Sequence, residues 1–249
     1  MRTVAIICAR IGSKRLPMKV LRFLNDNRII YHIIHRAATL DDCEWIIAIP
    51  HTDKGFAQEL ERREPIPSYR AVECDEEDVL TRILTVAKQE QADVIYRITA
   101  DNPLLDKTVV DLTRKRFDQT KADYAYMMGL PDGCAIEIFT LESFLRVDKL
   151  AINADLREHP TMGYYVHSDE FRLCFPFAPV ELQGRYRLTI DERDDLLVMQ
   201  AIFQACGDDV TVQQAIEYLD SHPDIAKINA HIQQEARIGF EFANKITTD

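Results

Sequence analysis

The sequence predicts an α/β fold with a doubly wound, mostly parallel sheet and a small antiparallel insertion. Short continuous apolar runs, typical of strands buried on both faces of a parallel sheet, alternate with helix-like stretches over residues 1–122. Their spacing fits βαβ units. Residues 123–186 differ, because Gly, Pro and aromatic residues gather there. The length of 249 residues suits one such domain with a modest insertion.

Three buried strands are predicted in the first part of the chain. They cover Val4 to Ala9, Trp45 to Pro50 and Asp93 to Thr99. A shorter apolar segment surrounds Val72. Ligands of open α/β sheets bind outside the carboxyl ends of the strands, so the residues that follow these runs are the first candidates for a functional site.

Helices are predicted between these strands and after them. They cover residues 29–39 and 53–63, the stretch from the acidic cap 75–78 through Lys88, and a helix carrying Val109, Val110 and Leu112. Asp106 is placed to cap the last of these.

The second half of the chain is predicted to leave the main domain and return to it. Residues 135–140 (AIEIFT) and 171–177 (FRLCFPF) are expected to be antiparallel strands projecting from the sheet, with a helix near residues 141–149. Residues 187–190 are expected to form a short strand of the main domain. Helices at 194–205, 212–219 and 224–235 should close the fold.

Composition and charge exclude several classes of protein. The net charge of −11 argues against a nucleic-acid-coating protein, which needs a basic face. No run approaches the ~18 apolar residues of a membrane span. Six cysteines without a CxxC pair argue against a zinc site, and a chain of this length needs no disulfide framework. The N-terminal MRTVAIICAR resembles a buried strand more than a signal peptide, so we expect a cytoplasmic protein.

The loop after the first strand, ARIGSKRLPMKVL at residues 9–21, is basic in an acidic chain. Its bases and small residues are Arg10, Gly12, Ser13, Lys14, Arg15 and Lys19. Small residues let the backbone approach a ligand, successive N–H groups can form an anion nest, and Arg and Lys can neutralise phosphates. A solvated basic turn is an equally good interpretation of this spacing, since it matches neither a Walker loop nor GxGxxG.

Two carboxylates follow predicted strands at the same edge of the sheet. Asp101 lies in RITADNP and Asp191 in RLTIDERDDL. Two separate carboxylates that converge on a triphosphate can hold Mg²⁺. For either residue alone, a helix N-cap is the better interpretation; the nearby basic loop favours the metal.

A charged triplet, Arg157-Glu158-His159, precedes Pro160 within the insertion. It could bind a carboxylate or phosphate of a substrate. An exposed, salt-bridged turn is equally compatible with the sequence.

The chain resembles the cytidylyltransferase-like family that includes the spore-coat polysaccharide biosynthesis protein F proteins. More distantly, it is similar to the 3-deoxy-manno-octulosonate and acylneuraminate cytidylyltransferases. The matching stretches run in the family's order over nearly the whole chain: VAIICARIGSKRLPMKVL, EEDVLTR, RITADNPLLD, LPDGCAIEIF, LREHPT, RLTIDERDDL and YLDSHPDIAKINAHI.

The resemblance implies a nucleotide-diphospho-sugar transferase-like fold and Mg²⁺-dependent transfer of CMP from CTP to a sugar acid, sugar or similar small acceptor. It implies a nucleotide-binding domain of residues 1–122 and 187–249, and an insertion, 123–186, for acceptor binding and homodimerisation. The nucleotide-binding residues it implies are Ala9, Arg10, Gly12, Ser13, Arg15, Lys19, Arg82 and Thr99. Those implied for catalysis are Arg15, Lys19 and Asp101, for magnesium Asp101 and Asp191, and for the acceptor Glu137, Arg157, Glu158 and His159.

Three positions depart from the family pattern. Met18 and Cys74 stand where the family usually has Gly, and Ala135 stands where it usually has Asp. Three other functions therefore stay open: transfer from another NTP, a glycosyltransferase that consumes a nucleotide sugar, and a non-catalytic nucleotide-binding subunit.

Overall fold

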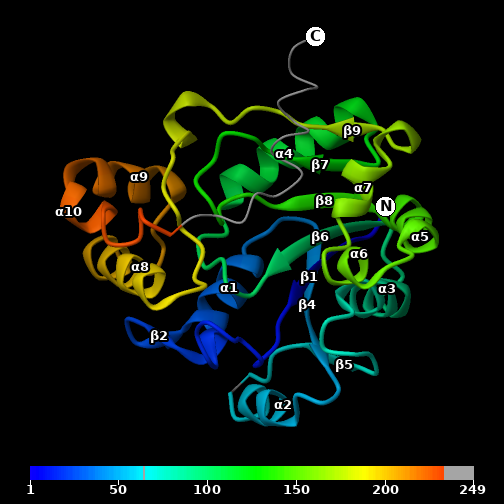
Figure 1. Ribbon diagram of the computed structural model, residues 1–249, viewed down its shortest axis with the longest axis horizontal. Helices are drawn as coiled ribbons and strands as arrows, with labels where there is room; N and C mark the ends of the chain where they lie inside the picture. Colours follow the sequence, from blue (N-terminus) through cyan, green and yellow to red (C-terminus); the bar gives the residue numbers. More distant parts are fainter. Residues whose placement is uncertain (64, 233–249) are drawn as a thin grey trace.

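A computed structural model describes residues 1–63 and 65–232, and its centre is a seven-stranded sheet with the order β5-β4-β1-β6-β8-β7-β9 (Figure 1). The strands are β1 (Thr3–Cys8), β4 (Cys43–Pro50), β5 (Tyr69–Val72), β6 (Val94–Thr99), β7 (Tyr124–Tyr126), β8 (Glu137–Thr140) and β9 (Leu173–Cys174). The β5-β4-β1-β6 part is parallel, and β8 runs antiparallel to both of its neighbours. A separate antiparallel pair joins β2 (Phe23–Leu24) to β3 (Asn27–Arg28). The predicted fold class is confirmed.

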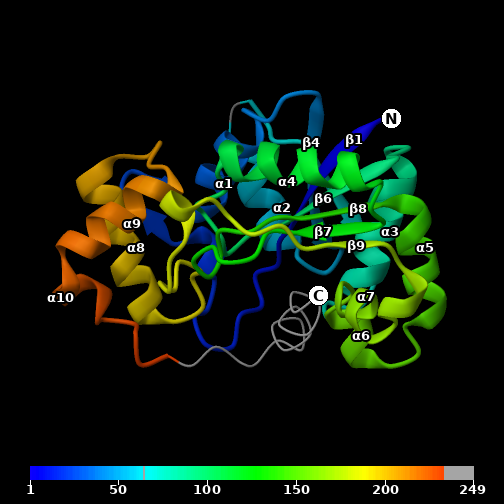
Figure 2. The same ribbon diagram turned by 90° about the horizontal axis from the view of Figure 1, so that it is seen from above.

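Helices cover both faces of the sheet, and two hydrophobic cores result. Along β1, Ala5 and Ile7 face one core while Val4 and Ile6 face the other, as alternation along a strand requires. The first core is covered by α1 (Ile29–Ala37), α2 (Lys54–Glu61), α4 (Lys107–Thr120), α8 (Arg193–Cys206) and α9 (Val212–Ser221). The second is covered by α3 (Val79–Gln89), α5 (Leu141–Leu150), α6 (Ala154–Glu158) and α7 (Met162–Val166). Figure 2 shows α8 and α9 far from α5, α6 and α7, with the sheet between them.

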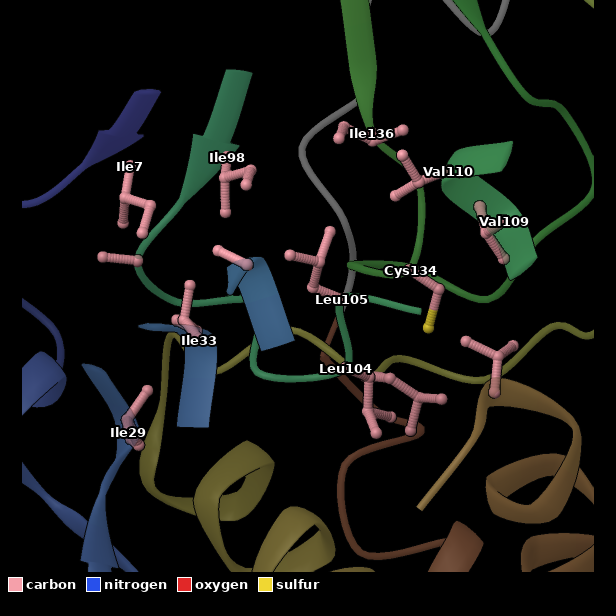
Figure 3. Close-up of a cluster of buried hydrophobic side chains, with 14 of the residues drawn as sticks. Ile7, Ile29, Ile33, Ile98, Leu104, Leu105, Val109, Val110, Cys134 and Ile136 are labelled. Carbon is pink, nitrogen blue, oxygen red and sulfur yellow. The ribbon is translucent and has the colours of Figure 1, made fainter. Parts of the chain in front are cut away.

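The first core joins the sheet to the loop that follows β6. Figure 3 shows Ile7 and Ile98 on their strands, Ile33 on α1 and Leu104 in that loop, all of them buried. Because the loop begins at the carboxyl end of β6, this packing helps to fix the backbone near Asp101.

Helix caps agree with the sequence where they could be predicted. The Asp106 carboxylate accepts a hydrogen bond from the Thr108 N–H at 2.8 Å, so the predicted cap of α4 is confirmed. Its second oxygen accepts from the Val212 N–H at 2.8 Å, which also ties α9 to α4. Asp78 caps α3 in the same manner, at 2.9 Å from the Thr81 N–H.

The insertion differs from the sequence prediction in how it joins the sheet. A strand in AIEIFT is present as β8, but the strands extend the main sheet and do not project from it. The strand in FRLCFPF is reduced to β9 and runs parallel to β7. Without β8, the N–H and C=O groups along one side of β6 would be unpaired. Pairing with β8 satisfies them.

Two predicted elements near the end of the chain are wrong in extent or type. Residues 187–190 form no strand, because their β pairing is limited to an isolated bridge between Asp132 and Arg187. The helix expected at 224–235 is limited to α10 (Pro223–Ala226), and residues 233–235 lie outside the described residues. Shortly after α10, Asn229 bonds the Arg187 carbonyl with its side-chain amide at 2.9 Å, an alternative to continuing the helix.

No helix among the described residues has the length and apolar character that crossing a bilayer requires.

Gly133 allows its loop to approach the backbone of Leu188 and Thr189 closely. Its φ is +87°, and a Cβ there would lie 2.7 Å from the Thr189 nitrogen and 2.9 Å from the Leu188 carbonyl. We expect Gly133→Ala to lower the free energy of unfolding by about 2 kcal/mol or more, because left-handed strain adds to a backbone clash. Chemical denaturation measures this change.

Gly207→Ala is the matched control, since Gly207 has a φ of +86° and open space within 4 Å. Alanine at this position would introduce backbone strain from the positive φ but no steric clash. Equal losses of stability in the two variants would show that the close backbone approach at Gly133 does not contribute to the loss.

Candidate functional site

Lys19 joins the two carboxylates that follow the predicted strands. Its Nζ lies 2.7 Å from Asp101 Oδ2 and 2.8 Å from Asp191 Oδ1. Lys19 comes from the basic loop, Asp101 from the end of β6, and Asp191 from the segment before α8. The Ile190 N–H donates to the Asp101 carbonyl at 2.9 Å, which holds the two acidic segments side by side. The structure thus brings together three residues that are far apart in sequence.

These three side chains are mostly buried, and the pairing shifts the pKa values of Lys19 and Asp101. Burial alone would lower the pKa of Lys19, but Asp101 and Asp191 outweigh it, and the pKa is raised. Burial alone would raise the pKa of Asp101, but the charge and hydrogen bond of Lys19 outweigh it, and the pKa is lowered. Lys19 and Asp101 are therefore a charged pair at neutral pH.

The other bases of the loop also face carboxylates. The Arg15 guanidinium lies 3.4 Å from Asp191 Oδ1 and 3.7 Å from a Glu192 oxygen. Arg10 lies 3.8 Å from Glu76 and 3.5 Å from Glu158. A polyphosphate bound here could replace these carboxylates as the partner of the two arginines.

The small residues of the loop and the ends of β1 and β6 shape the same edge. Gly12 lies against the side chain of Glu76, whose Oε1 would lie 1.9 Å from a Cβ at that position. The Ser13 hydroxyl accepts from the Leu16 N–H at 3.4 Å. Ala9 is buried at the end of β1, where its N–H bonds the Ala48 carbonyl. The Thr99 hydroxyl accepts from the Asn102 amide at 2.7 Å.

Met18 lies at the turn between Arg15 and Lys19 with a φ of 55°. Glycine adopts this left-handed conformation without a Cβ penalty, which explains why the family pattern has Gly there. The Met18 side chain is 49% exposed, so it points away from the core. The loop keeps its turn, because the Met18 carbonyl accepts from the Leu21 N–H at 2.9 Å.

Arg82 is buried, with 1% of its surface exposed. It donates to the carbonyl oxygens of Asp75 and Glu76, and its Nε has no hydrogen-bond partner among the described residues. Burial raises the pKa of the Cys74 thiol, and the nearby positive charge of Arg82 opposes this only in part. Arg82 thus holds the acidic segment that covers Gly12.

The expected acceptor residues separate into different environments. Glu137 forms a buried ion pair with Arg97 and accepts from the Tyr124 hydroxyl at 2.9 Å. Burial would raise the pKa of Glu137, but Arg97 and the hydrogen bonds lower it. Arg97 was not among the predicted site residues, although a charged residue inside the apolar run of β6 was a usable signal.

Arg157 is held by protein partners. Its Nε donates to Asp78 at 3.1 Å, its second nitrogen donates to the Thr81 hydroxyl at 2.6 Å, and its third lies 3.4 Å from Asp148. These contacts tie α6 to α3 and α5. Glu158 faces Arg10 instead, and His159 is exposed just after α6.

Ala135, where the family pattern has Asp, is half-buried and packs against the first core. It precedes β8 and therefore lies close to Glu137 in the chain. The substitution removes one carboxylate from this edge of the sheet.

Arg187 and Asp195 form a second ion pair behind Asp191, and neither was among the predicted site residues. Arg187 donates to Asp191 Oδ2 at 2.9 Å and to Asp195 at 2.9 and 3.2 Å. Asp195 is completely buried. In the sequence these residues look like a solvated charge run, so periodicity alone gave no sign of their burial.

Two carboxylates, those of Asp101 and Asp191, are the candidate metal ligands of this site. Among residues 1–63 and 65–232, no group of three or more His, Cys, Asp or Glu side chains could hold a metal ion by itself. Mg²⁺ commonly uses one or two carboxylates and completes its shell with phosphate oxygens and water. Asp101 and Asp191 already share one cation, the Lys19 ammonium, and so fit such an ion when a phosphate ligand accompanies it.

Comparison with known proteins gives a family match over most of the chain. The family model described as Cytidylyltransferase matches residues 4–235. The spore coat polysaccharide biosynthesis protein SpsF of Bacillus subtilis (strain 168) is 33% identical over 229 residues, which cover 89% of this chain and 95% of that protein.

Two solved structures share the fold. A cytidylyltransferase from Leptospira borgpetersenii serovar Hardjo-bovis has a TM-score of 0.79 at 24% identity, covering 94% of this chain and 100% of that one. CMP:2-keto-3-deoxy-manno-octonic acid synthetase, solved in complex with CTP, has a TM-score of 0.63 at 16% identity, covering 82% and 99% of the two chains.

Proposed function

The chain belongs to the cytidylyltransferase family and is an enzyme, and we propose that it transfers CMP from CTP to a sugar acid, sugar or similar small acceptor with release of pyrophosphate. The observation that carries this proposal is the convergence of Lys19, Asp101 and Asp191 beside a loop of further bases. A triphosphate needs such a basic loop, and the carboxylates suit a metal that accompanies it.

In the proposed reaction, an acceptor oxygen attacks the α-phosphorus of CTP and pyrophosphate leaves. Such chemistry depends mainly on alignment and charge neutralisation, so no covalent enzyme intermediate is required. Lys19 would exchange one carboxylate for a phosphoryl oxygen and neutralise charge that develops there. Arg10 and Arg15 are half-exposed beside it and would bind the leaving pyrophosphate.

We propose Mg²⁺ as the cofactor, held by Asp101 and Asp191. The bound ion would neutralise phosphate charge and orient the phosphates. Lys19 would then give up one of its two carboxylate partners and contact the nucleotide.

The relatives support the choice of CTP and of a saccharide-like acceptor. The B. subtilis relative is named for spore coat polysaccharide biosynthesis, and the synthetase with the shared fold was solved with CTP. We propose the polar cluster around Glu137, Arg97 and Tyr124 as one part of the acceptor region. Glu158 and His159, at the end of α6, would form a second part.

We propose that residues 123–186 also form a homodimer contact. Phe177 and Val180 follow the edge strand β9 and are 58% and 82% exposed. An exposed strand edge beside apolar side chains is a surface that a second copy could cover.

The test is pyrophosphate release with each of the four common NTPs and a panel of sugar acids, sugar phosphates and phosphonates. We expect release with CTP, Mg²⁺ and one acceptor class, and protection of the fold by CTP in a thermal shift. Release with a different NTP would identify that nucleotide as the substrate. Consumption of a nucleotide sugar without pyrophosphate would indicate a glycosyltransferase, and CTP binding without turnover would indicate a non-catalytic subunit.

A further inference from the structure

We propose that Arg187 is a positioning residue that fixes the orientation of Asp191, and that the buried pair of Asp195 and Asn229 holds Arg187 in place. This inference rests on the proposed function, in which Asp191 holds a metal ion. It adds a layer of residues behind the site and connects the site to the closing segment of the chain.

The contacts of Asp191 divide its two oxygens between different partners. Oδ2 accepts from Arg187 at 2.9 Å. Oδ1 faces the basic loop, at 2.8 Å from Lys19 and 3.4 Å from Arg15. A carboxylate held at one oxygen cannot rotate freely, so the other oxygen stays directed toward the ligand edge.

Asp195 holds Arg187 by two hydrogen bonds, at 2.9 Å to Nε and 3.2 Å to the terminal nitrogen. The planar guanidinium and the carboxylate suit this two-point geometry. Asp195 Oδ2 also accepts from the backbone N–H groups of Asp191 and Glu192, both at 3.0 Å. The same carboxylate therefore fixes both the backbone of Asp191 and the arginine that orients its side chain.

Asn229 completes this unit from 34 residues further along the chain. Its side-chain amide donates to Asp195 Oδ1 at 3.0 Å and to the Arg187 carbonyl at 2.9 Å. Asn229 is 3% exposed and Asp195 0%, so water does not substitute for these bonds without a rearrangement.

The effect of this unit on Asp191 is mainly geometric. The charges of Arg187 and Asp195 offset each other, so together they add little net charge behind the site. Asp132, at 3.9 Å, is a further carboxylate beside Arg187. Loss of the unit should therefore weaken metal binding through misorientation, and residues behind a metal ligand commonly contribute about 10- to 100-fold to affinity.

The experiment is a titration of the full chain with Mn²⁺ in the presence of CTP, followed by electron paramagnetic resonance. We expect Asn229→Ala and Arg187→Met to weaken Mn²⁺ binding about 10-fold or more, and Arg187→Lys to recover part of the loss. Affinity for metal-free CTP should stay unchanged, because the unit does not face the loop bases. Asn229→Ala leaves the charge of the protein unchanged. It therefore tests the positioning role even if Arg187→Met fails to fold.

His231→Ala is the matched control, since His231 lies in the same segment, is 66% exposed and faces Asp194 at 3.7 Å. It should bind Mn²⁺ like the wild type. Wild-type Mn²⁺ affinity in a folded Asn229→Ala protein would overturn the positioning role alone. A wild-type chain that binds no Mn²⁺ with CTP would overturn the proposed metal site, and this inference with it.

Discussion

Replacing Lys19 by alanine is expected to lower kcat by about 10²-fold or more, the scale of losing one group that stabilises charge in a transition state. The free energy of unfolding should fall as well, by about 1–3 kcal/mol, because Asp101 and Asp191 would lose their shared partner. In a solvated basic turn the loss of one base would leave stability unchanged, but only 16% of the Lys19 side chain is exposed. Pyrophosphate release and chemical denaturation measure the two effects.

Two other bases of the same loop separate these effects. Lys14 is 96% exposed and 3.8 Å from Glu77, so Lys14→Ala should keep both turnover and stability. Arg15 is half-exposed, so Arg15→Ala should lose turnover about 10²-fold with little change in stability. Wild-type turnover in both Lys19→Ala and Arg15→Ala would show that this loop does not bind the reacting phosphates.

The parallel part of the fold could be predicted because local sequence determines it. Val4 to Ala9 is apolar at every position since β1 is buried on both faces, and Asp106 was identifiable as a cap from its place before a helix. Residues 187–190 alternate polar and apolar side chains as a strand would, yet the Leu188 and Ile190 N–H groups donate to the Asp132 and Asp101 carbonyls. Partners so distant in sequence leave no periodic signal, and the strand prediction failed for that reason.

Like the fold, the site could be predicted from the sequence only in part. Lys19, Asp101 and Asp191 could be selected because each follows a strand-like run, and strand ends meet at one edge of a sheet. Arg157 was expected to be free for a ligand, but Asp78, 79 residues earlier in the chain, binds it. Asp195 could not be recognised as buried, because its burial depends on Arg187 and on the tertiary contact with Asn229.

Replacing Asp101 by asparagine is expected to abolish most of the activity, with a loss of about 10²-fold or more in kcat. Asparagine keeps the shape of the side chain and removes the charge that both Lys19 and the proposed metal require. Raising the Mg²⁺ concentration should recover little turnover. Asp191→Asn should have the same effect. Asp194→Asn should retain activity, because Asp194 is a half-buried position of α8 whose side chain faces His231.

The stability of Asp101→Asn should differ from that of the wild type in a pH-dependent manner. Because the pKa of Asp101 is lowered in the folded protein, its ionised form favours folding above its unfolded pKa of about 3.9. This contribution is present at neutral pH and is lost as pH falls through the folded pKa. Denaturation at pH 7 and below pH 4 should therefore show a stability gap that narrows in acid. A gap of constant size, together with full activity in the presence of a chelator, would contradict both the Lys19 pairing and the assigned metal role of Asp101.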